Sequence, residues 1–140
     1  MPKILFVDND EDTRNMICCI FTYPFFEVVC ANSVQEALQL FVNCMASEKF
    51  DLVLTRMDMH NPFIGTDLAR QIDDIEEKEG IEIKSRTPVI IRTGDMRTFA
   101  YASAVIPSIL PMDTLIGIVT AFRKTLIKDG EYPPFFIGEV

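Results

Sequence analysis

Charged side chains follow the first and third apolar runs of this chain, at the points where each run ends. Asp8, Asn9 and Asp10 come directly after Lys3–Val7, and Arg56 comes directly after the third run. Three clustered carboxylates would carry a charge of about −3 and would call for a divalent cation with oxygen ligands. Here Asp8 contributes one negative charge, Asn9 none and Arg56 one positive charge, so the charges cancel. The sequence therefore predicts no metal at this place.

Arg56 distinguishes this pocket from an ordinary acidic one. A guanidinium lying between Asp8 and Asp10 can take the place of a cation through bidentate hydrogen bonds. We predict that Arg56 substitutes for a metal ion and holds the pocket in one state. Other interpretations stay open for the acidic residues: a helix start favoured by the macrodipole, a weak residual metal site, or a partner-binding patch.

Short apolar runs alternate with helical patterns along the chain, which indicates βαβ units and a parallel sheet. In such a sheet the ligand crevice lies beyond the carboxyl ends of the strands. Pro107 falls in the last run, and proline is tolerated in an edge strand but hardly in a central one. The five predicted strands are Lys3–Val7, Phe26–Ala31, Phe50–Thr55, Pro88–Thr93 and Ala104–Ile109.

Helices are predicted where apolar residues recur at spacings of three and four. Ser33 and Glu36 are expected to form a capping box for the second helix, and Gly80 to end the third. The run Glu76–Glu79 is predicted to face solvent. Two later helices are expected over 95–102 and 113–128. The expected inward-facing residues are Met16, Ile17, Ile20 and Phe21 in the first helix, Val34, Ala37, Leu38, Phe41 and Met45 in the second, and Leu68, Ile72 and Ile75 in the third.

Length and composition set further bounds. The 140 residues fit one domain, and a net charge of −8 argues against a nucleic-acid-binding surface. No apolar run approaches the ~20 residues needed to cross a bilayer, and the start lacks the pattern of a signal peptide. Cys18, Cys19, Cys30 and Cys44 lack CxxC or metal-finger spacing, so they are expected to be scattered buried thiols. We expect a cytoplasmic protein with neither a membrane nor a nucleic acid as partner.

Three segments, ILFVDND, DLVLTRMDMHNPFIG and TPVIIRTGD, resemble the receiver domain of bacterial two-component response regulators. The stretch LARQIDDIEEKEGIEIKSRTPVII is especially similar to receivers attached to hybrid histidine kinases. The resemblance implies an α/β fold of the flavodoxin-like type: a doubly wound, five-stranded parallel sheet in the order 2-1-3-4-5, with five helices. The expected organisation is a receiver-like domain over residues 1–128 and a C-terminal apolar tail over residues 129–140.

The resemblance also assigns a role to each position of the pocket. Receivers hold Mg²⁺ with two successive acids after the first strand, and the matching residues here are Asp8 and Asn9. The phosphoacceptor aspartate of receivers matches Arg56. The hydroxyl residue that ends the fourth strand matches Thr93, and the lysine before a proline matches Leu110. The acceptor, one metal-site acid and the lysine are therefore absent, and Mg²⁺ binding is not expected.

We predict a pseudo-receiver that works without phosphorylation, as a protein–protein interaction module in signal transduction and not as an enzyme. A phosphoryl acceptor must be a nucleophile, and the guanidinium of Arg56 has no lone pair to offer. One alternative is a receiver that is still phosphorylated, with Mg²⁺, on a substitute aspartate: Asp58, Asp10 or Asp95. Another is a flavodoxin-like binder of a small ligand, although no Gly-rich phosphate loop follows the first strand.

The C-terminal region is expected to supply the partner surface. In receivers the fourth helix, fifth strand and fifth helix form the output and dimerisation surface. The expected helix over 113–128 is apolar on more than one side, so part of it should face a signalling protein, a second copy of the chain, or the tail. Whether Tyr132–Ile137 folds back over this helix or makes an intermolecular contact stays open.

Overall fold

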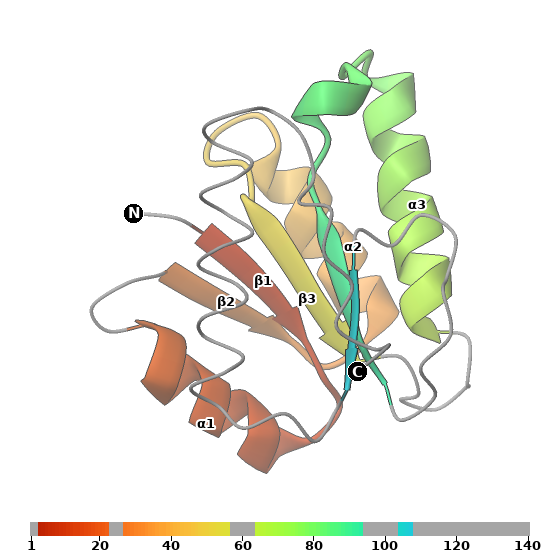
Figure 1. Cartoon of the computed structure of the whole chain (residues 1–140). Helices are drawn as coiled ribbons and strands as arrows, with labels where there is room; N and C mark the ends of the chain where they lie inside the picture. Colours follow the sequence, from red (N-terminus) through yellow and green to blue (C-terminus); the bar gives the residue numbers. More distant parts are fainter. Residues whose placement is uncertain (1–2, 23–26, 57–63, 94–103, 108–140) are drawn as a thin grey trace.

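The described residues of the computed structural model, 3–22, 27–56, 64–93 and 104–107, form a single parallel sheet with helices on both faces (Figure 1). The strands stand in the order β2-β1-β3-β4-β5, so β1, β3 and β4 are central and β2 and β5 are the edges. The strands are β1 (Lys3–Val7), β2 (Glu27–Ala31), β3 (Leu52–Arg56), β4 (Val89–Thr93) and β5 (Ala104–Pro107).

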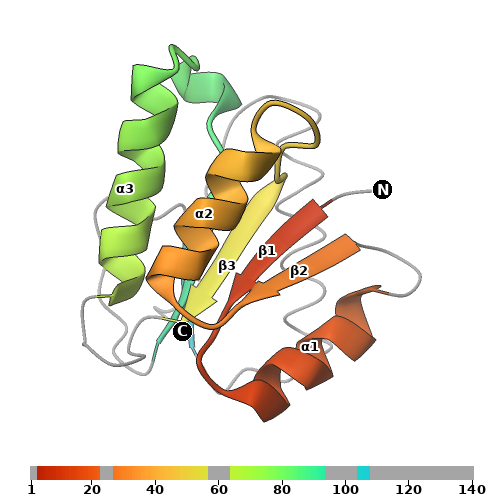
Figure 2. The same ribbon diagram turned by 180° about the vertical axis from the view of Figure 1, so that it is seen from behind.

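Helices cover the two faces of the sheet. Seen from behind, α2 (Val34–Cys44) and α3 (Ile64–Lys78) lie side by side over one face (Figure 2). On the other face α1 (Glu11–Thr22) packs against β2. A short 3₁₀ helix, η1 (Ile83–Ser85), connects α3 to β4 and was not predicted from the sequence. Among the described residues no helix combines the length and apolarity that a membrane crossing requires.

Both faces of the central strands are buried, which explains their nearly continuous apolar sequence. Because side chains alternate along a strand, each strand contributes every second residue to each face. The side chains toward α2 and α3 pack with Phe41 and Leu68 of those helices. They are Leu5, Val7, Val53, Val89 and Ile91, and their neighbours Ile4, Phe6, Leu54 and Ile90, equally buried, point to the opposite face.

The sequence predicts most of this arrangement. The doubly wound parallel sheet and its strand order are confirmed, and Pro107 does lie in an edge strand. β3 begins at Leu52 rather than Phe50 and extends to include Arg56. The fourth and fifth predicted helices and the tail lie outside the described residues, as does any boundary at residue 128. These parts stay predictions.

The predicted inward-facing residues of the first three helices are confirmed with one exception among the described side chains, which do not include those of Ile20 and Phe21. Ala37, Phe41, Leu68 and Ile72 are buried as expected, and Val34, Leu38, Met45 and Ile75 pack against them. Met16 was predicted to face inward but is 45% exposed, whereas Ile17 is fully buried. Neighbouring residues of a helix differ by about 100° in direction. Once Ile17 faces the sheet, Met16 therefore points away from it.

The ends of α2 and α3 carry the expected capping residues. Ser33 Oγ accepts a hydrogen bond from the Glu36 amide at 3.1 Å and so caps α2. Gly80 has a positive φ of 73°, which a glycine adopts at little cost. This turn lets the Gly80 and Ile81 amides donate to the carbonyls of Glu77 and Glu76, the pattern of a Schellman motif.

Glu76 contradicts the prediction that the whole run Glu76–Glu79 is solvated. Its side chain is fully buried, while those of the three residues that follow are exposed. One carboxylate oxygen accepts a hydrogen bond from the Thr87 amide at 2.9 Å, and the other accepts from the Thr87 hydroxyl at 3.1 Å. Lys49 Nζ lies 2.8 Å from the same carboxylate and balances its charge. Glu76 therefore joins the end of α3 to the start of β4.

We predict that Glu76→Gln lowers the free energy of unfolding by about 1–3 kcal/mol, because it removes a buried charged acceptor opposite Lys49. Glu77→Gln is the matched control one residue along, and this exposed change should stay within about 0.5 kcal/mol of the wild type. Urea unfolding of the three proteins measures the difference. Equal stability of both variants would show that Glu76 contributes no more than a surface residue.

Candidate functional site

Strand register gathers the charged residues of the pocket at the carboxyl ends of the central strands. Val7 pairs with Thr55, so Asp8 emerges beside Arg56 at the end of β3. Arg56 in turn pairs with Arg92 on β4. Paired residues of parallel strands point to the same face, and Arg56 and Arg92 share the face of Phe6 and Leu54. Asp8 comes two residues after Phe6 and therefore points to the same face. Three charged side chains from three strands therefore converge.

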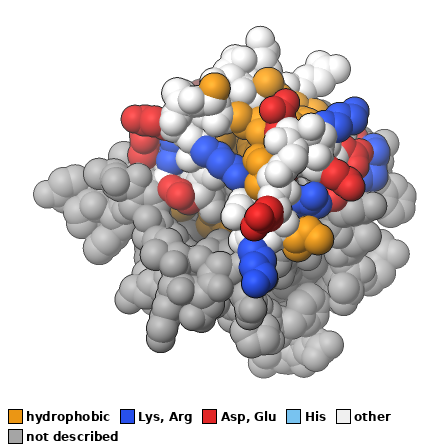
Figure 3. Space-filling view, turned by 90° about the horizontal axis from the view of Figure 1, so that it is seen from above, with side chains coloured by type: hydrophobic (Ala, Val, Ile, Leu, Met, Phe, Trp, Pro, Cys, Tyr) orange, Lys and Arg blue, Asp and Glu red, His pale blue; other side chains and the backbone are white. Residues whose placement is uncertain are grey.

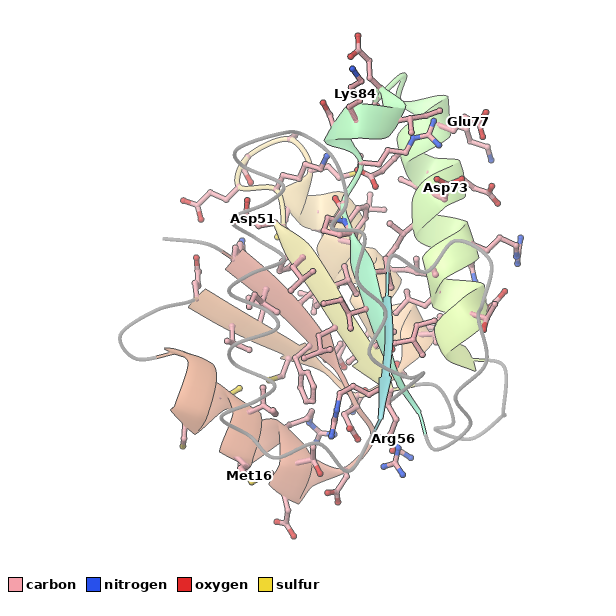
Figure 4. All side chains as sticks on the ribbon, in the orientation of Figure 1. Met16, Asp51, Arg56, Asp73, Glu77 and Lys84 are labelled. Carbon is pink, nitrogen blue, oxygen red and sulfur yellow. The ribbon has the colours of Figure 1, made fainter. Side chains whose placement is uncertain are left out.

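The Asp8 carboxylate lies between two guanidinium groups. Its side chain is only 1% exposed. Arg92 Nη1 donates to Oδ2 at 3.4 Å, and Arg56 Nη1 lies 3.7 Å from Oδ1. The Arg92 side chain is 11% exposed and also stacks over the Phe6 ring, 5.9 Å from its centroid. Arg56 is 37% exposed and lies at the solvent side of the pocket (Figure 4). Arg92 is thus the deeper and Arg56 the outer cation.

The start of α1 completes the pocket. The Asp10 amide donates to Asp8 Oδ1 at 2.9 Å. Asp10 Oδ2 accepts from the Thr13 amide at 3.1 Å and from the Thr13 hydroxyl, so Asp10 caps the helix. Arg14 Nη1 donates to the Asp8 carbonyl at 2.8 Å, which fixes the turn from β1 into α1. Two carboxylates therefore face three guanidinium groups.

The electrostatics follow from these contacts. Burial lowers the pKa of Arg92, the nearby Asp8 carboxylate raises it, and Arg56 lowers it again. Hydrogen bonds from the Thr13 side chain and amide hold the pKa of Asp10 below its ordinary value, and the charges of Arg56 and Arg14 lower it further. Arg92 still carries its charge near neutral pH, since an arginine in a protein is effectively always protonated, and the lowered pKa of Asp10 keeps that carboxylate ionised there.

These residues do not fit the Mg²⁺ ion that the receiver resemblance implies. Both oxygens of Asp8 already have guanidinium neighbours, at 3.4 and 3.7 Å. An amide, Asn9, stands where the second acid would be, and a cation stands at the acceptor position. A divalent cation would lie beside the positive charges of Arg56 and Arg92 and would be repelled by them. No step of the chemistry is therefore assigned to a metal.

Most, but not all, of the site residues predicted from the sequence can be placed. Asp8 and Arg56 form an ion pair at 3.7 Å, and the charge of Arg56 also acts on Asp10. Asn9, the residue between Asp8 and Asp10 in the sequence, is half-buried. Thr93 ends β4, and its side chain is outside the described residues. Leu110, Asp58 and Asp95 also lie outside them, so their roles stay predictions.

Sequence reasoning missed Arg92 and Arg14. Arg92 interrupts an otherwise apolar strand, and its position is in register with Arg56, so a paired-strand argument would have put both on one face. Arg14 falls in the first turns of α1, where its contact with the Asp8 carbonyl could not be inferred from spacing. The pocket therefore holds three arginines, two more than the one predicted from the sequence.

Acidic residues elsewhere on the described surface take part in ion pairs. Asp73, Asp74 and Glu77 of α3 bring carboxylate oxygens close enough to share a cation, but Asp73 pairs with Arg86 and Asp74 with Arg70. Asp73 and Glu77 lie far from Arg56, toward the opposite end of the sheet (Figure 4). Figure 3, which views the molecule from that end, shows basic and acidic side chains interspersed among hydrophobic ones. The described part of this face thus has no patch of one sign.

Comparisons with known proteins agree on the fold. No family model matches the chain. It is 35% identical over 92 residues to the regulatory protein AtoC of Escherichia coli, a match that covers 65% of this chain but only 17% of AtoC. A response regulator receiver domain protein from Clostridium thermocellum shares 27% identity and superposes with a TM-score of 0.68 over 91% of this chain and 99% of its own. A CheY-like receiver domain protein from Methanospirillum hungatei reaches a TM-score of 0.71 at 19% identity, over 92% and 98% of the two chains.

The chain therefore has the fold of the response regulator receiver domains. The part of AtoC that it matches is a small fraction of that protein, so the activity of AtoC as a whole is not carried over. Within this fold, the pocket at the carboxyl ends of β1, β3 and β4 holds Asp8 paired with two arginines. The closer similarity to receivers of hybrid histidine kinases stays a prediction.

We predict that Arg92→Met destabilises the protein more than Arg56→Met does. Removing Arg92 leaves a buried Asp8 with its deeper partner gone, which should cost about 2–4 kcal/mol. Arg56 is more exposed, so solvent screens its charge and its loss should cost about 1 kcal/mol or less. Chemical denaturation of both variants tests the ranking.

The double variant Asp8→Asn with Arg92→Met provides the control, because it removes both buried charges together. It should be more stable than the sum of the two single changes predicts. Strict additivity would show that Asp8 and Arg92 do not interact energetically.

A separate prediction concerns the pH dependence of the α1 cap. Because the pKa of Asp10 in the folded protein is lowered, its stabilising effect is present above the ordinary value of 3.8 and is lost as the pH falls through the lower folded value. Asp10→Asn keeps an oxygen that can cap the helix but cannot titrate. The stability advantage of the wild type over Asp10→Asn should therefore shrink on acidification, which melting curves at several pH values would reveal. A stability difference between the two proteins that stays constant with pH would contradict a lowered pKa of Asp10 in the folded state.

Proposed function

We propose that this chain is a pseudo-receiver, a protein–protein interaction module of signal transduction that works without phosphorylation. The observation that carries the proposal is the position of Arg56. It ends β3, where the receiver resemblance places the phosphoacceptor, and its guanidinium faces the Asp8 carboxylate at 3.7 Å. A guanidinium is a donor only and cannot attack phosphorus.

Arg92 supports the proposal independently of Arg56. It lies against the second oxygen of Asp8, so the acid that would hold a metal is neutralised from inside the protein. Even with an aspartate at position 56, the buried guanidinium would still compete with a divalent cation. Two residues on neighbouring strands, Arg56 on β3 and Arg92 on β4, therefore each oppose phosphoryl transfer in this proposal.

The proposal implies that the pocket has one conformational state rather than two. A phosphorylatable receiver changes conformation when charge is added to its pocket. Here the opposing charges are part of the folded chain, so no covalent event is needed to hold the pocket together. A partner would then bind the single conformation of the unmodified domain, and binding would not depend on phosphorylation.

The test is an intact-mass measurement after incubation with acetyl phosphate and Mg²⁺. We expect no phosphoryl adduct on the wild type. We also expect none on Arg56→Asp, because Arg92 still neutralises Asp8. A triple variant, Asn9→Asp with Arg56→Asp and Arg92→Ala, restores the acids and removes the deeper cation. It should acquire an adduct only when Mg²⁺ is present.

Two outcomes would overturn parts of this proposal. A Mg²⁺-dependent adduct on the wild type would mean that a substitute carboxylate, Asp10, Asp58 or Asp95, keeps a working switch, and peptide mapping would identify it. A triple variant that is folded by circular dichroism but accepts no phosphoryl group would show that these three positions do not account for the missing chemistry.

A further inference from the structure

Two of the four cysteines lie side by side on the face of the sheet that α1 covers. Cys18 belongs to α1 and Cys30 to β2, and their sulfurs are 2.6 Å apart. Neither is fully buried. The prediction of scattered buried thiols is wrong: Cys19 is exposed, the other three are only half-buried, and Cys18 and Cys30 form a pair.

The pairing follows from the packing of α1 on the sheet. α1 contacts β2 more than any other described strand. Ile17 is fully buried and fixes the rotation of the helix, and Cys18 then faces β2. Alternation along β2 turns Val29 toward α2 and Cys30 toward α1. The two thiols therefore meet through elements that the core already holds in place.

Their separation is close to that of a covalent bond. A disulfide has a sulfur–sulfur distance of about 2.05 Å, so a shift of roughly half an ångström would bring these atoms together. The two residues are 12 apart in sequence. Because the two sulfurs are already this close, forming the bond requires no rearrangement of the sheet.

We propose that Cys18 and Cys30 form a redox modification site, closed to a disulfide by a peroxide and reopened by a low-molecular-weight thiol. In the closing reaction the Cys18 thiolate attacks one peroxide oxygen, which yields a sulfenic acid and releases water once the leaving oxygen is protonated. Cys30 then attacks the sulfenic sulfur, and its proton leaves with the hydroxide as a second water. The two sulfurs together lose two electrons, which reduce the peroxide.

The environment distinguishes the roles of the two thiols. Burial raises the pKa of the Cys30 thiol to about 12, and its hydrogen bond with Cys18 and the charge of Cys18 add to the rise. A thiol that deprotonates so reluctantly is a poor first nucleophile. Cys18 is therefore the attacking residue, and Cys30 resolves the sulfenic acid because it is already in contact.

The bond would change how α1 is held. α1 carries Arg14, which donates to the Asp8 carbonyl, and Asp10 caps its first turn. A covalent link between α1 and β2 would fix this helix relative to the acid–arginine pocket. The site thus gives a domain without phosphoryl chemistry a reversible way to stiffen the same region.

The test uses the full chain treated with hydrogen peroxide, quenched, denatured and alkylated with N-ethylmaleimide. Intact mass should show alkylation of two of the four cysteines after oxidation, and of all four after dithiothreitol. Peptide mapping without reduction should recover a fragment linking Cys18 to Cys30. The oxidised protein should also melt at a higher temperature than the reduced one, because the cross-link constrains the unfolded chain.

Single serine variants provide the controls. Cys19→Ser, which removes the exposed neighbour, and Cys44→Ser should each still lose two thiols on oxidation. Cys18→Ser and Cys30→Ser should form no intramolecular disulfide. The proposal is overturned if the wild type keeps four alkylatable thiols under peroxide. It is equally overturned if the loss of two thiols persists in Cys18→Ser, or if mapping shows Cys19 in the bond.

Discussion

The carboxylate of Asp8 is the constraint on which the rest of this pocket depends. It follows a strand whose last four residues are buried and is itself almost inaccessible to water, so its charge must be compensated from within the protein. Arg92 provides the inner compensation and Arg56 the outer one. Given this requirement, we expect Arg92 in particular to stabilise the fold, and both guanidinium groups would compete with a divalent cation for Asp8. One interaction thus explains both the stability of the site and the chemistry that we propose it lacks.

Polar side chains elsewhere in the described chain also find their partners within the protein. Asp10 caps α1, Ser33 caps α2, and Glu76 accepts hydrogen bonds from both the amide and the hydroxyl of Thr87. Each polar group sits at the end of an element, where unpaired backbone donors are found. Between these ends the central strands are mostly apolar on both faces, with Thr55 and Arg92 as buried polar exceptions.

The fold could be predicted from the sequence because it depends on periodicity, which is local. Alternating short apolar runs and amphipathic helices identified the parallel sheet, and Pro107 identified its edge. Asp8, Asp10 and Arg56 could be predicted because they lie at or just beyond the carboxyl ends of strands. Arg92, the burial of Glu76 and the meeting of Cys18 with Cys30 depend on contacts between elements distant in sequence. Those contacts are set by strand register and helix rotation, which the residue pattern alone does not specify.

The anchoring of Glu76 to Thr87 has a consequence for how the chain could vary. It fastens both ends of the segment that holds Gly80 and η1, so the sheet does not depend on the path taken between them. Ile83, in the middle of that segment, is 73% exposed and contributes no core packing. Lengthening a loop whose ends are already fixed costs only a slowly growing entropy. Relatives of this chain could therefore differ in the length of this connection, and new surface features could be added there, without disturbing the strands that build the pocket.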